Sequence, residues 1–424
     1  MSGFQLVETV DTTGFGDTGM RLGDLDGDGE QEVVFFQARD CHIPRMSAGG
    51  YRHEKQVHCI TAMKLDGEVM WQEGVPLGTG YWAMHGLAAE VADIDADGRT
   101  EVVYVTERGG RSYLRILEGD RGYLRKEVET GPNCVMQLCD IRGLGAKRDI
   151  LVSTYLNPIY IYSDDLTCLW NCHFYGGAGH HHASADIDGD GREELFIGYC
   201  CVRADGSKIW WRPDLEPHLE EMTRAPHVDS LQIHDIDADG RLELLMVAGR
   251  DLIVLDAATG EDRWIFQGEH IQSCAVGDFL PDRDGLQLFL TERRLRGDRE
   301  AAGYRGYMVD CRGRELWRRD KAGYGRRIAI DQREADCIFT TPPGRPPTII
   351  DGQGAVIQEL QMPAFTWRED RFDDGDTGLR ALYAITDVDA DGREEILAYN
   401  RTRLWRWGQG QGEEAGPQIC PAAP

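Results

Sequence analysis

Positive charge is scarce in this chain. Its 424 residues contain 46 lysines and arginines against 73 aspartates and glutamates, which gives a net charge of −27. Nucleic-acid-binding proteins present a basic face, so this balance argues against nucleic acid as a partner. An anionic substrate would need a pocket that is locally basic, because the remaining surface repels it.

Long apolar runs are also missing. No stretch approaches the ~20 apolar residues of a membrane-spanning helix, so we expect no membrane partner. The N-terminus, MSGFQLVETVDTTG, lacks the basic segment and apolar core of a secretory signal. The 12 cysteines are spread irregularly, without a disulfide-scaffold spacing. We therefore expect reduced thiols and a cytoplasmic protein, or a secreted or periplasmic one if a signal peptide has been trimmed.

One loop sequence occurs five times. Each copy has Asp at its first, third and fifth positions, Gly at the sixth and Glu at the ninth, and an apolar stretch follows. The copies are DLDGDGEQE at Asp24, DIDADGRTE at Asp93, DIDGDGREE at Asp186, DIDADGRLE at Asp235 and DVDADGREE at Asp387. A repeat of this kind dictates the fold.

The repeated loop has the composition of a calcium site. Alternate aspartates and a returning glutamate place hard oxygens around one point, and the glycine allows the turn. The alternative is an Asp/Gly-rich hairpin turn without metal, but four crowded acids would repel one another. We predict several structural Ca²⁺ ions held by Asp24, Asp26, Asp28, Glu32, Asp93, Asp95, Asp97, Glu101, Asp186, Asp188, Asp190, Glu194, Asp235, Asp237, Asp239, Glu243, Asp387, Asp389, Asp391 and Glu395.

The repeat predicts an all-β fold. Three further units, at Asp140, at Asp278 and near Ile330, keep the strand pattern and lose the carboxylates. The spacings between units two to six are 47, 46, 49 and 43 residues, and the first gap is 69. A period of about 40–50 residues with about four short strands is typical of a β-propeller.

We therefore predict a single β-propeller over residues 1–424, with no linker or composition break. It would have eight blades, or seven with a decorated edge, stapled by D-x-D-x-D-G calcium loops. The N-terminal FQLVETV could complete the last unit, which has few strands of its own.

The first unit carries a Cys/His-rich insertion at residues 38–60. Cysteine and histidine in fours suit a tetrahedral Zn²⁺, and a closed set of four ligands is structural. Strand alternation sends His58 and Cys59 to opposite faces, so only one is expected to be a ligand. A polar surface loop is the alternative. We predict one zinc site formed by Cys41, His42, His53 and His58.

Histidines recur just before the repeated loops. His85, His227 and His270 each stand eight residues before the first Asp of their unit, and His181 is the middle of a triplet before Asp186. In a propeller the innermost strands line a central channel, so these imidazoles would converge on one rim. Chance placement is the competing explanation, since the chain has only 12 histidines.

A tyrosine and an arginine could be neighbours in the fourth unit. Tyr199 ends ELFIGY, and Arg212 follows IWW one hairpin later. Tyr155 holds the equivalent strand position one unit earlier. Packing between blades for the tyrosine, and a solvated charge for the arginine, are the structural alternatives.

Histidine, tyrosine and arginine without a Ser or Cys nucleophile motif favour acid–base chemistry on an anion. Arginine pairs bidentately with a carboxylate, which acidifies the adjacent proton. Histidine or tyrosine could then remove the C5 proton of a uronic acid and protonate the departing O4. The result is β-elimination. Hydrolysis would need a pair of free carboxylates, and the recurring acids here lie in the predicted metal loops.

The chain resembles the propeller polysaccharide lyases. GHHHASADIDGDGREELFIGYCCVRADGSKIWW and HIQSCAVGDFLPDRDGLQLFLTE are similar to blades of rhamnogalacturonan lyases of polysaccharide lyase family 11. The size and the Cys/His insertion look more like the ulvan lyases and the rhamnose–glucuronate lyases. The D-x-D-x-D-G loops alone are less specific, because integrin-type FG-GAP repeats share them.

The resemblance implies calcium- and sometimes zinc-containing propellers that act by elimination. It implies Tyr199 as catalytic acid or base, Arg212 as carboxylate neutraliser, and catalytic rim histidines among His85, His181 and His227. Ulvan-type sequences have paired histidines in the preceding blade, where this chain has Asn133 and Tyr155. We assign these two, with His270, to substrate binding.

Three functions remain in competition. The first is a lyase that cleaves beside a uronic acid in a rhamnose-containing oligo- or polysaccharide and acts as a monomer. The second is a non-catalytic, integrin-like propeller that binds glycan or protein. The third and weakest is a glycoside hydrolase.

Overall fold

The computed structural model describes residues 3–15, 19–40, 55–76, 87–131, 135–153, 158–173, 179, 181–215, 228–293, 304–366, 382–410 and 418–420. In these residues every regular element is a β-strand, and none is a helix. The predicted all-β class is confirmed. The same residues contain no helix of the length and apolarity needed to cross a membrane.

The chain forms two compact units. Unit 1 contains Met1–Asp11, Gln232–Ala257 and Glu261–Cys420, and unit 2 contains Thr12–Leu231 and Ala258–Gly260. A single domain over residues 1–424 therefore stays a prediction.

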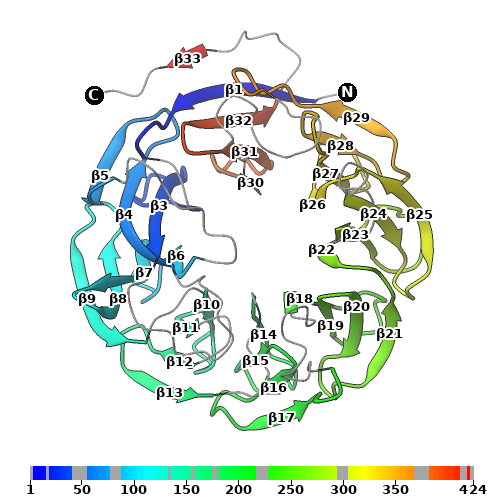
Figure 1. Cartoon of the computed structure of the whole chain (residues 1–424), viewed down its shortest axis with the longest axis horizontal. Coiled ribbons are helices and arrows are strands. Elements are labelled where there is room, and N and C mark those ends of the chain that lie inside the picture. Colours follow the sequence, from blue (N-terminus) through cyan, green and yellow to red (C-terminus); the bar gives the residue numbers. More distant parts are fainter. Residues whose placement is uncertain are drawn as a thin grey trace. The chain divides into compact units, whose positions relative to one another are not determined.

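Unit 2 contains four antiparallel groups of four strands (Figure 1). The first two groups are linked by one parallel bridge between Val57 and Thr106. The strands are β2 (Gly19–Gly23), β3 (Glu32–Asp40), β4 (Lys55–Met63), β5 (Val69–Gly74), β6 (Ala89–Ala92), β7 (Glu101–Arg108), β8 (Arg111–Glu118), β9 (Leu124–Thr130), β10 (Val135–Cys139), β11 (Asp149–Ser153), β12 (Ile159–Tyr162), β13 (Cys168–Cys172), β14 (Ala183–Ala185), β15 (Glu194–Ile197), β16 (Cys200–Val202) and β17 (Lys208–Trp211).

Unit 1 contains three more such groups and a last sheet in the order β30-β31-β32-β1-β33. Strand β18 begins in unit 2 and ends in unit 1. The strands are β18 (Val228–His234), β19 (Glu243–Ala248), β20 (Asp251–Asp256), β21 (Asp262–Phe266), β22 (Ile271–Gly277), β23 (Gln287–Arg293), β24 (Tyr304–Val309), β25 (Glu315–Asp320), β26 (Tyr324–Ile328), β27 (Cys337–Thr341), β28 (Thr348–Ile350), β29 (Val356–Glu359), β30 (Leu382–Thr386), β31 (Glu395–Tyr399), β32 (Arg403–Gln409), β1 (Phe4–Asp11) and β33 (Gln418–Cys420).

The N-terminal strand completes the last sheet, as the sequence predicted. Strand β1 pairs antiparallel with β32, from Phe4 opposite Gln409 to Asp11 opposite Arg403. Strands β1 and β33, from opposite parts of the chain, thus lie in one sheet of unit 1. The propeller and its blade number stay predictions, although the described strands repeat in groups of four.

Burial follows the position of a strand in its group. The second strands, such as β7, β15 and β19, are buried along nearly their whole length, whereas the fourth strands β13 and β21 alternate between exposed and half-buried. A strand covered on both faces reads as a continuous apolar run. This is why EVVYV, ELFI and ELLMVA carry little period-two alternation.

Neighbouring sheets of each unit pack face to face. In unit 2, Val102 and Tyr104 of β7 pack against β3 and β4, while Val103 and Val105 pack against β11. Because successive side chains of a strand point to opposite faces, one strand contributes to two cores. Unit 1 repeats this arrangement, with Phe289 in one core and its neighbours Leu288 and Leu290 in the other.

A tryptophan on the outer strand of one sheet contacts a turn of the next. The indole Nε1 atoms of Trp71, Trp170, Trp264 and Trp317 donate to turn carbonyls of Gly119, Ala204, Cys311 and Gly352 at 2.6, 2.8, 2.9 and 2.8 Å. A glycine of the same turn lies beneath each indole. Buried indole N–H groups require a partner, and this contact supplies it.

Gly313→Ala should destabilise the protein by about 1–3 kcal/mol more than Gly145→Ala, because overpacking adds to backbone strain. Both glycines have positive φ, 80° and 76°. A Cβ on Gly313 would lie 2.7 Å from the Trp264 ring, whereas one on Gly145 meets nothing within 4 Å. Chemical denaturation of the two variants measures the difference. Equal losses would show that the tryptophan contact contributes nothing.

Candidate active site and metal loops

The five repeated loops bring their carboxylates together. In each loop, three carboxylate oxygens lie within 4.8 Å of one another, a separation that fits oxygens 2.3–2.6 Å from a shared Ca²⁺. The sets are Asp24, Asp26 and Glu32; Asp93, Asp95 and Glu101; Asp186, Asp188 and Glu194; Asp235, Asp237 and Asp239; and Asp387, Asp389 and Glu395.

The glutamate at the ninth position holds the loop closed. Its buried carboxylate accepts a hydrogen bond from the backbone N–H of the second loop residue in all five loops, at 2.8–3.2 Å. Burial, together with nearby aspartates, raises the pKa of Glu101 and of Glu395 to about 7. A bound cation would favour the ionised form of these groups.

Basic side chains lie on four of the five loops. Each pairs with loop carboxylates and offsets part of their charge. The pairs are Lys64 with Asp26, Arg125 with Asp95 and Glu101, Arg263 with Asp239 and Glu243, and Arg393 with Asp391. Among the described residues, no basic side chain pairs with Asp186, Asp188, Asp190 or Glu194, the predicted ligands of the remaining loop, although Lys147 pairs with Glu193 at its eighth position. The predicted metal ligands of this loop are therefore the least compensated by ion pairs.

The loop at Asp140, which lost its carboxylates, is held by an internal cation. Arg142 stands at the third position, and its Nε donates to the buried Asp149 at 2.5 Å. Another guanidinium nitrogen donates to Asp164 at 3.0 Å. An arginine here connects the acids that a metal ion would connect elsewhere.

Three predicted site residues, with the neighbouring His182, lie at the same end of the β14–β17 sheet. Strands β14 and β15 pair Ala183 with Phe196, so the residues before β14 lie at the same end as those after β15. His181 and His182 precede β14, and Tyr199 follows β15. Arg212 follows β17 and donates its backbone N–H to the Tyr199 carbonyl at 3.0 Å. The Asp186 loop lies at the opposite end.

Tyr199 and Arg212 are adjacent, as the sequence predicted, but differ in access to solvent. Tyr199 is 3% exposed. The Arg212 guanidinium pairs with Asp214 at 2.7 and 2.9 Å and donates to the Gly260 carbonyl at 2.8 Å. The Asp214 side chain is 59% exposed, and such surface ion pairs contribute little net free energy. A substrate carboxylate could replace Asp214 at small cost.

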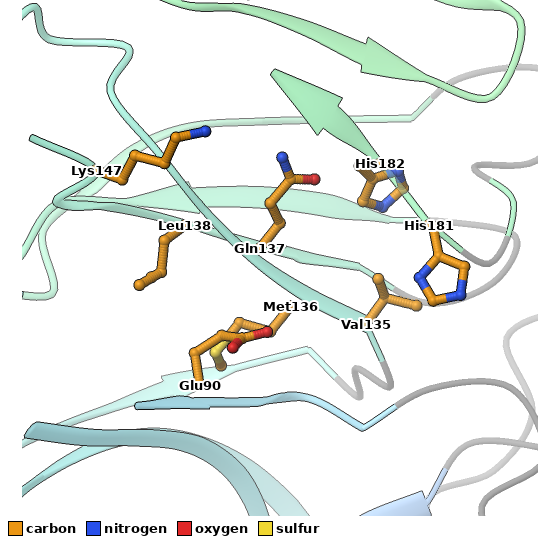
Figure 2. A pocket seen from close by; sticks show the side chains of 8 residues that line it. All are labelled: Glu90, Val135, Met136, Gln137, Leu138, Lys147, His181 and His182. Carbon is orange, nitrogen blue, oxygen red and sulfur yellow. The ribbon is translucent and has the colours of Figure 1, made fainter. Parts of the chain in front are cut away.

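A cavity of about 370 Å³ begins beside the histidines. Figure 2 shows His181, His182 and Val135 at one end, Lys147 and Leu138 at the other, and Gln137 between them. Lys147 pairs with Glu193 at 3.0 Å, and Glu90 pairs with Arg21 at 3.1 Å. The exposed His181 is therefore the lining group most suited to exchange a proton with a ligand.

His182 is buried and hydrogen-bonded, unlike the exposed His181 next to it. Its Nε2 lies 2.7 Å from the Ser153 hydroxyl, and the ring is 7% exposed. The buried Nδ1 has no hydrogen-bond partner among the described residues. Burial, with a smaller effect of His181, lowers the pKa of His182 to about 3. The ring is therefore neutral near pH 7.

The His182 pKa predicts a loss of stability in acid. In the unfolded chain this histidine binds a proton near pH 6.5, whereas in the folded chain it binds one only near pH 3. The free energy of unfolding therefore falls as the pH drops below ~6.5. At about pH 5 the loss is on the order of 2 kcal/mol. His182→Gln should flatten the dependence of the unfolding free energy on pH, whereas the exposed His173→Gln should not. An unchanged slope in His182→Gln would contradict this assignment.

The structure describes only some of the remaining predicted site residues. His85, His227, Asn133, Tyr155, Cys41, His42 and His53 lie outside the described residues. His270 belongs to unit 1, where its ring contacts Gln272 at 2.8 Å. His58 is half-buried on β4. Cys59 beside it is 1% exposed, and burial raises the pKa of its thiol to about 11.

Sequence reasoning missed the cavity residues Glu90, Gln137 and Lys147 and the histidine partner Ser153. With its amide oriented to donate to the His182 carbonyl at 2.9 Å, Gln137 accepts from Ser184 at 3.2 Å. Glu90 and Gln137 could have been found from their position in the repeat, because both lie on the first strands of their four-strand groups. Lys147 belongs to a degenerate loop and gave no signal.

The comparisons with known proteins point to rhamnogalacturonan lyases. Over 334 residues the chain is 27% identical to rhamnogalacturonan endolyase YesW of Bacillus subtilis (strain 168), covering 63% of this chain and 50% of that protein. It is similar in fold to Bacillus licheniformis rhamnogalacturonan lyase PL11, with a TM-score of 0.65, 19% identity, and 95% and 75% of the two chains covered. The Dos1 propeller gives a TM-score of 0.54 at 10% identity, covering 96% of each chain. No family model matches.

These findings confirm the resemblance expected from the sequence. The chain spans about half the length of the curated relatives it matches. The solved structures are less than 25% identical and show similarity of fold.

Proposed function

We propose that this chain is a polysaccharide lyase that cleaves a rhamnogalacturonan-type glycan beside a uronic acid by β-elimination. The observation that carries the proposal is the 27% identity to a rhamnogalacturonan endolyase along 63% of the chain. The grouping of His181, Tyr199 and Arg212 at one end of a sheet supports it.

Arg212 is proposed to neutralise the substrate carboxylate. Its guanidinium is fixed by the Gly260 carbonyl, and the exposed Asp214 holds the place of an incoming carboxylate. Bidentate pairing would delocalise the charge that builds up at the carboxylate when the C5 proton leaves.

His181 is proposed to take the C5 proton. It is exposed and lines the cavity, whereas Tyr199 is 3% exposed and has little access to a substrate from solvent. Tyr199 remains the alternative acid or base. Removal of the proton forms the C4–C5 double bond, and the electron pair leaves with the O4 oxygen, which must be protonated.

The five acidic loops are proposed to hold structural Ca²⁺. Three converging carboxylate oxygens per loop fit a hard cation with oxygen ligands. The Ca²⁺ ion would offset part of the loop's negative charge and fix the turn between the first two strands of its sheet. The zinc site of Cys41, His42, His53 and His58 is also a proposal, and metal analysis of the purified protein tests it.

A closed eight-bladed propeller is the proposed arrangement of the two units. The groups of four strands and the similarity to the Dos1 propeller support it. Small-angle X-ray scattering tests it, because two separate units would give a larger radius of gyration than a closed ring.

A non-catalytic glycan-binding protein is the second candidate. The burial of Tyr199 favours it, because a substrate in solvent has little access to the hydroxyl. The pairing of Arg212 with Asp214 also favours it, because the guanidinium already has a carboxylate partner. The deciding experiment incubates the protein with rhamnogalacturonan and follows the ultraviolet absorbance of the unsaturated uronate product. A rise supports the lyase. Binding without a rise would leave the binding protein, and new reducing ends without absorbance would indicate hydrolysis.

A further inference from the structure

A second cavity lies in unit 1, apart from the residues discussed above. It occupies about 200 Å³ between the end of β25 and the sheet β26–β29. Pockets for drug-sized ligands measure roughly 300–1,000 Å³, so this one suits a single small ring.

The charge of this cavity is opposite to that of the chain. Three cations line it, Arg319, Lys321 and Arg345, against the carboxylates Asp320 and Glu359. Asp320 already pairs with Arg305 at 2.8 Å. Within the described part of the chain, neither Lys321 nor Arg345 pairs with a carboxylate. A local excess of positive charge in a chain of net charge −27 is the condition expected for an anion site.

The backbone that carries Lys321 is held in an unusual conformation. Lys321 has a φ of 57°, in the left-handed region that a lysine adopts at an energetic cost. Ala322 next to it donates its N–H to the Tyr304 carbonyl at 3.1 Å. The Gly323 carbonyl accepts from the Thr291 hydroxyl at 3.2 Å. The ammonium group therefore extends from a fixed turn.

The remaining lining suits a sugar ring. Val356, which is 51% exposed, provides apolar surface beside the buried Ile350. The exposed Glu359 can accept hydrogen bonds from sugar hydroxyls. Cations beside apolar surface and hydroxyl acceptors match a ring that carries one carboxylate.

We propose that this cavity is a second, non-catalytic site for one uronate residue of the polymer, with Lys321 and Arg345 binding the carboxylate. The ligand class rests on the proposed function. A long glycan bound at two points dissociates more slowly than one bound only at the active site, because each contact raises the effective concentration for the other.

The test is equilibrium dialysis of the full chain with methyl galacturonoside, which has no interresidue bond to cleave. We expect wild type to bind two equivalents and the double variant Lys321→Gly, Arg345→Gln to bind one, with at least ~10-fold weaker binding at the lost site. Glycine relieves the strain at position 321, so the variant should fold. Arg318→Gln is the matched control, since Arg318 is 62% exposed on β25 and does not line the cavity.

The outcomes separate this inference from the proposed function. If the cavity binds methyl galacturonoside and the active-site proposal is wrong, wild type binds one equivalent and the double variant binds none. Wild-type binding by the double variant would overturn the inference. So would equal binding of the neutral methyl galactoside, or full displacement by equimolar inorganic phosphate, which would indicate a site for any small anion.

Discussion

Replacing His181 by glutamine should lower the rate of rhamnogalacturonan cleavage by roughly 10²–10⁴-fold, the usual contribution of a general base. His181 is exposed and lines the 370 Å³ cavity, so it has the access that proton transfer requires. Glutamine keeps the polarity and removes the titrating group. The measurement is the initial rate of unsaturated-uronate formation at saturating substrate, with circular dichroism to confirm folding.

Two neighbours serve as controls for this variant. His182→Gln replaces the buried member of the pair, which is bonded to Ser153 and has no direct part in the proposed reaction. Tyr199→Phe removes the hydroxyl of the alternative base. If Tyr199→Phe loses the larger part of the rate while His181→Gln stays near wild type, the proton is taken by tyrosine and our assignment is wrong.

Substitutions at Arg212 and Asp214, assayed in the same way, test the proposed neutralisation of the substrate carboxylate. Arg212→Lys should recover little of the activity lost in Arg212→Ala, because an ammonium cannot pair bidentately with a carboxylate. Asp214→Asn should lower KM, since it removes the charge that competes for the guanidinium. An Arg212→Ala enzyme with wild-type kcat/KM would exclude carboxylate neutralisation by this residue.

Calcium removal is expected to cause the largest loss of stability. Each site filled at 100 times its Kd contributes about 2.7 kcal/mol to the unfolding free energy. The loop at Asp186 should bind most tightly, because no basic side chain of the described residues pairs with its four predicted ligands, Asp186, Asp188, Asp190 and Glu194. Asp188→Asn should therefore remove about 2–3 kcal/mol in excess calcium and much less in chelator.

The control for this prediction is Asp205→Asn. Asp188 and Asp205 both accept a backbone N–H two residues on, at 3.2 and 2.8 Å, and asparagine preserves that bond. Asp205 belongs to none of the five carboxylate clusters. Denaturation in calcium and in chelator measures all three proteins. Identical unfolding of wild type in both media would refute the calcium proposal.

The acidic loops could be predicted from sequence almost completely. Their acidic residues lie within nine residues of one another, so local spacing places them, and the structure brings three carboxylate oxygens of each loop together. Arg125, Arg263 and Lys64 could not be predicted as partners of these loops. Arg125 and Arg263 come from later strands and Lys64 directly follows β4, and only the strand pairing places them there.

The candidate active site was predicted in part. Tyr199 and Arg212 are neighbours because one hairpin register joins them, and a short hairpin can be read from sequence. The burial of Tyr199, the Ser153–His182 bond and the Asp214 ion pair depend on packing. Arg319, Lys321 and Arg345 are scattered over 27 positions of ordinary strand and loop sequence, and nothing in that sequence marked them as one site.

The amino-acid sequence by itself determined the repeat, the all-β class, the acidic loops and the joining of the N-terminal strand to the last sheet. Each of these depends on residues close in sequence or on a pattern repeated along it. Only the tertiary structure decided which imidazole is exposed, which carboxylates already have a cation, and where positive charge gathers. Those properties depend on distances between side chains from different sheets, and face-to-face packing sets these distances.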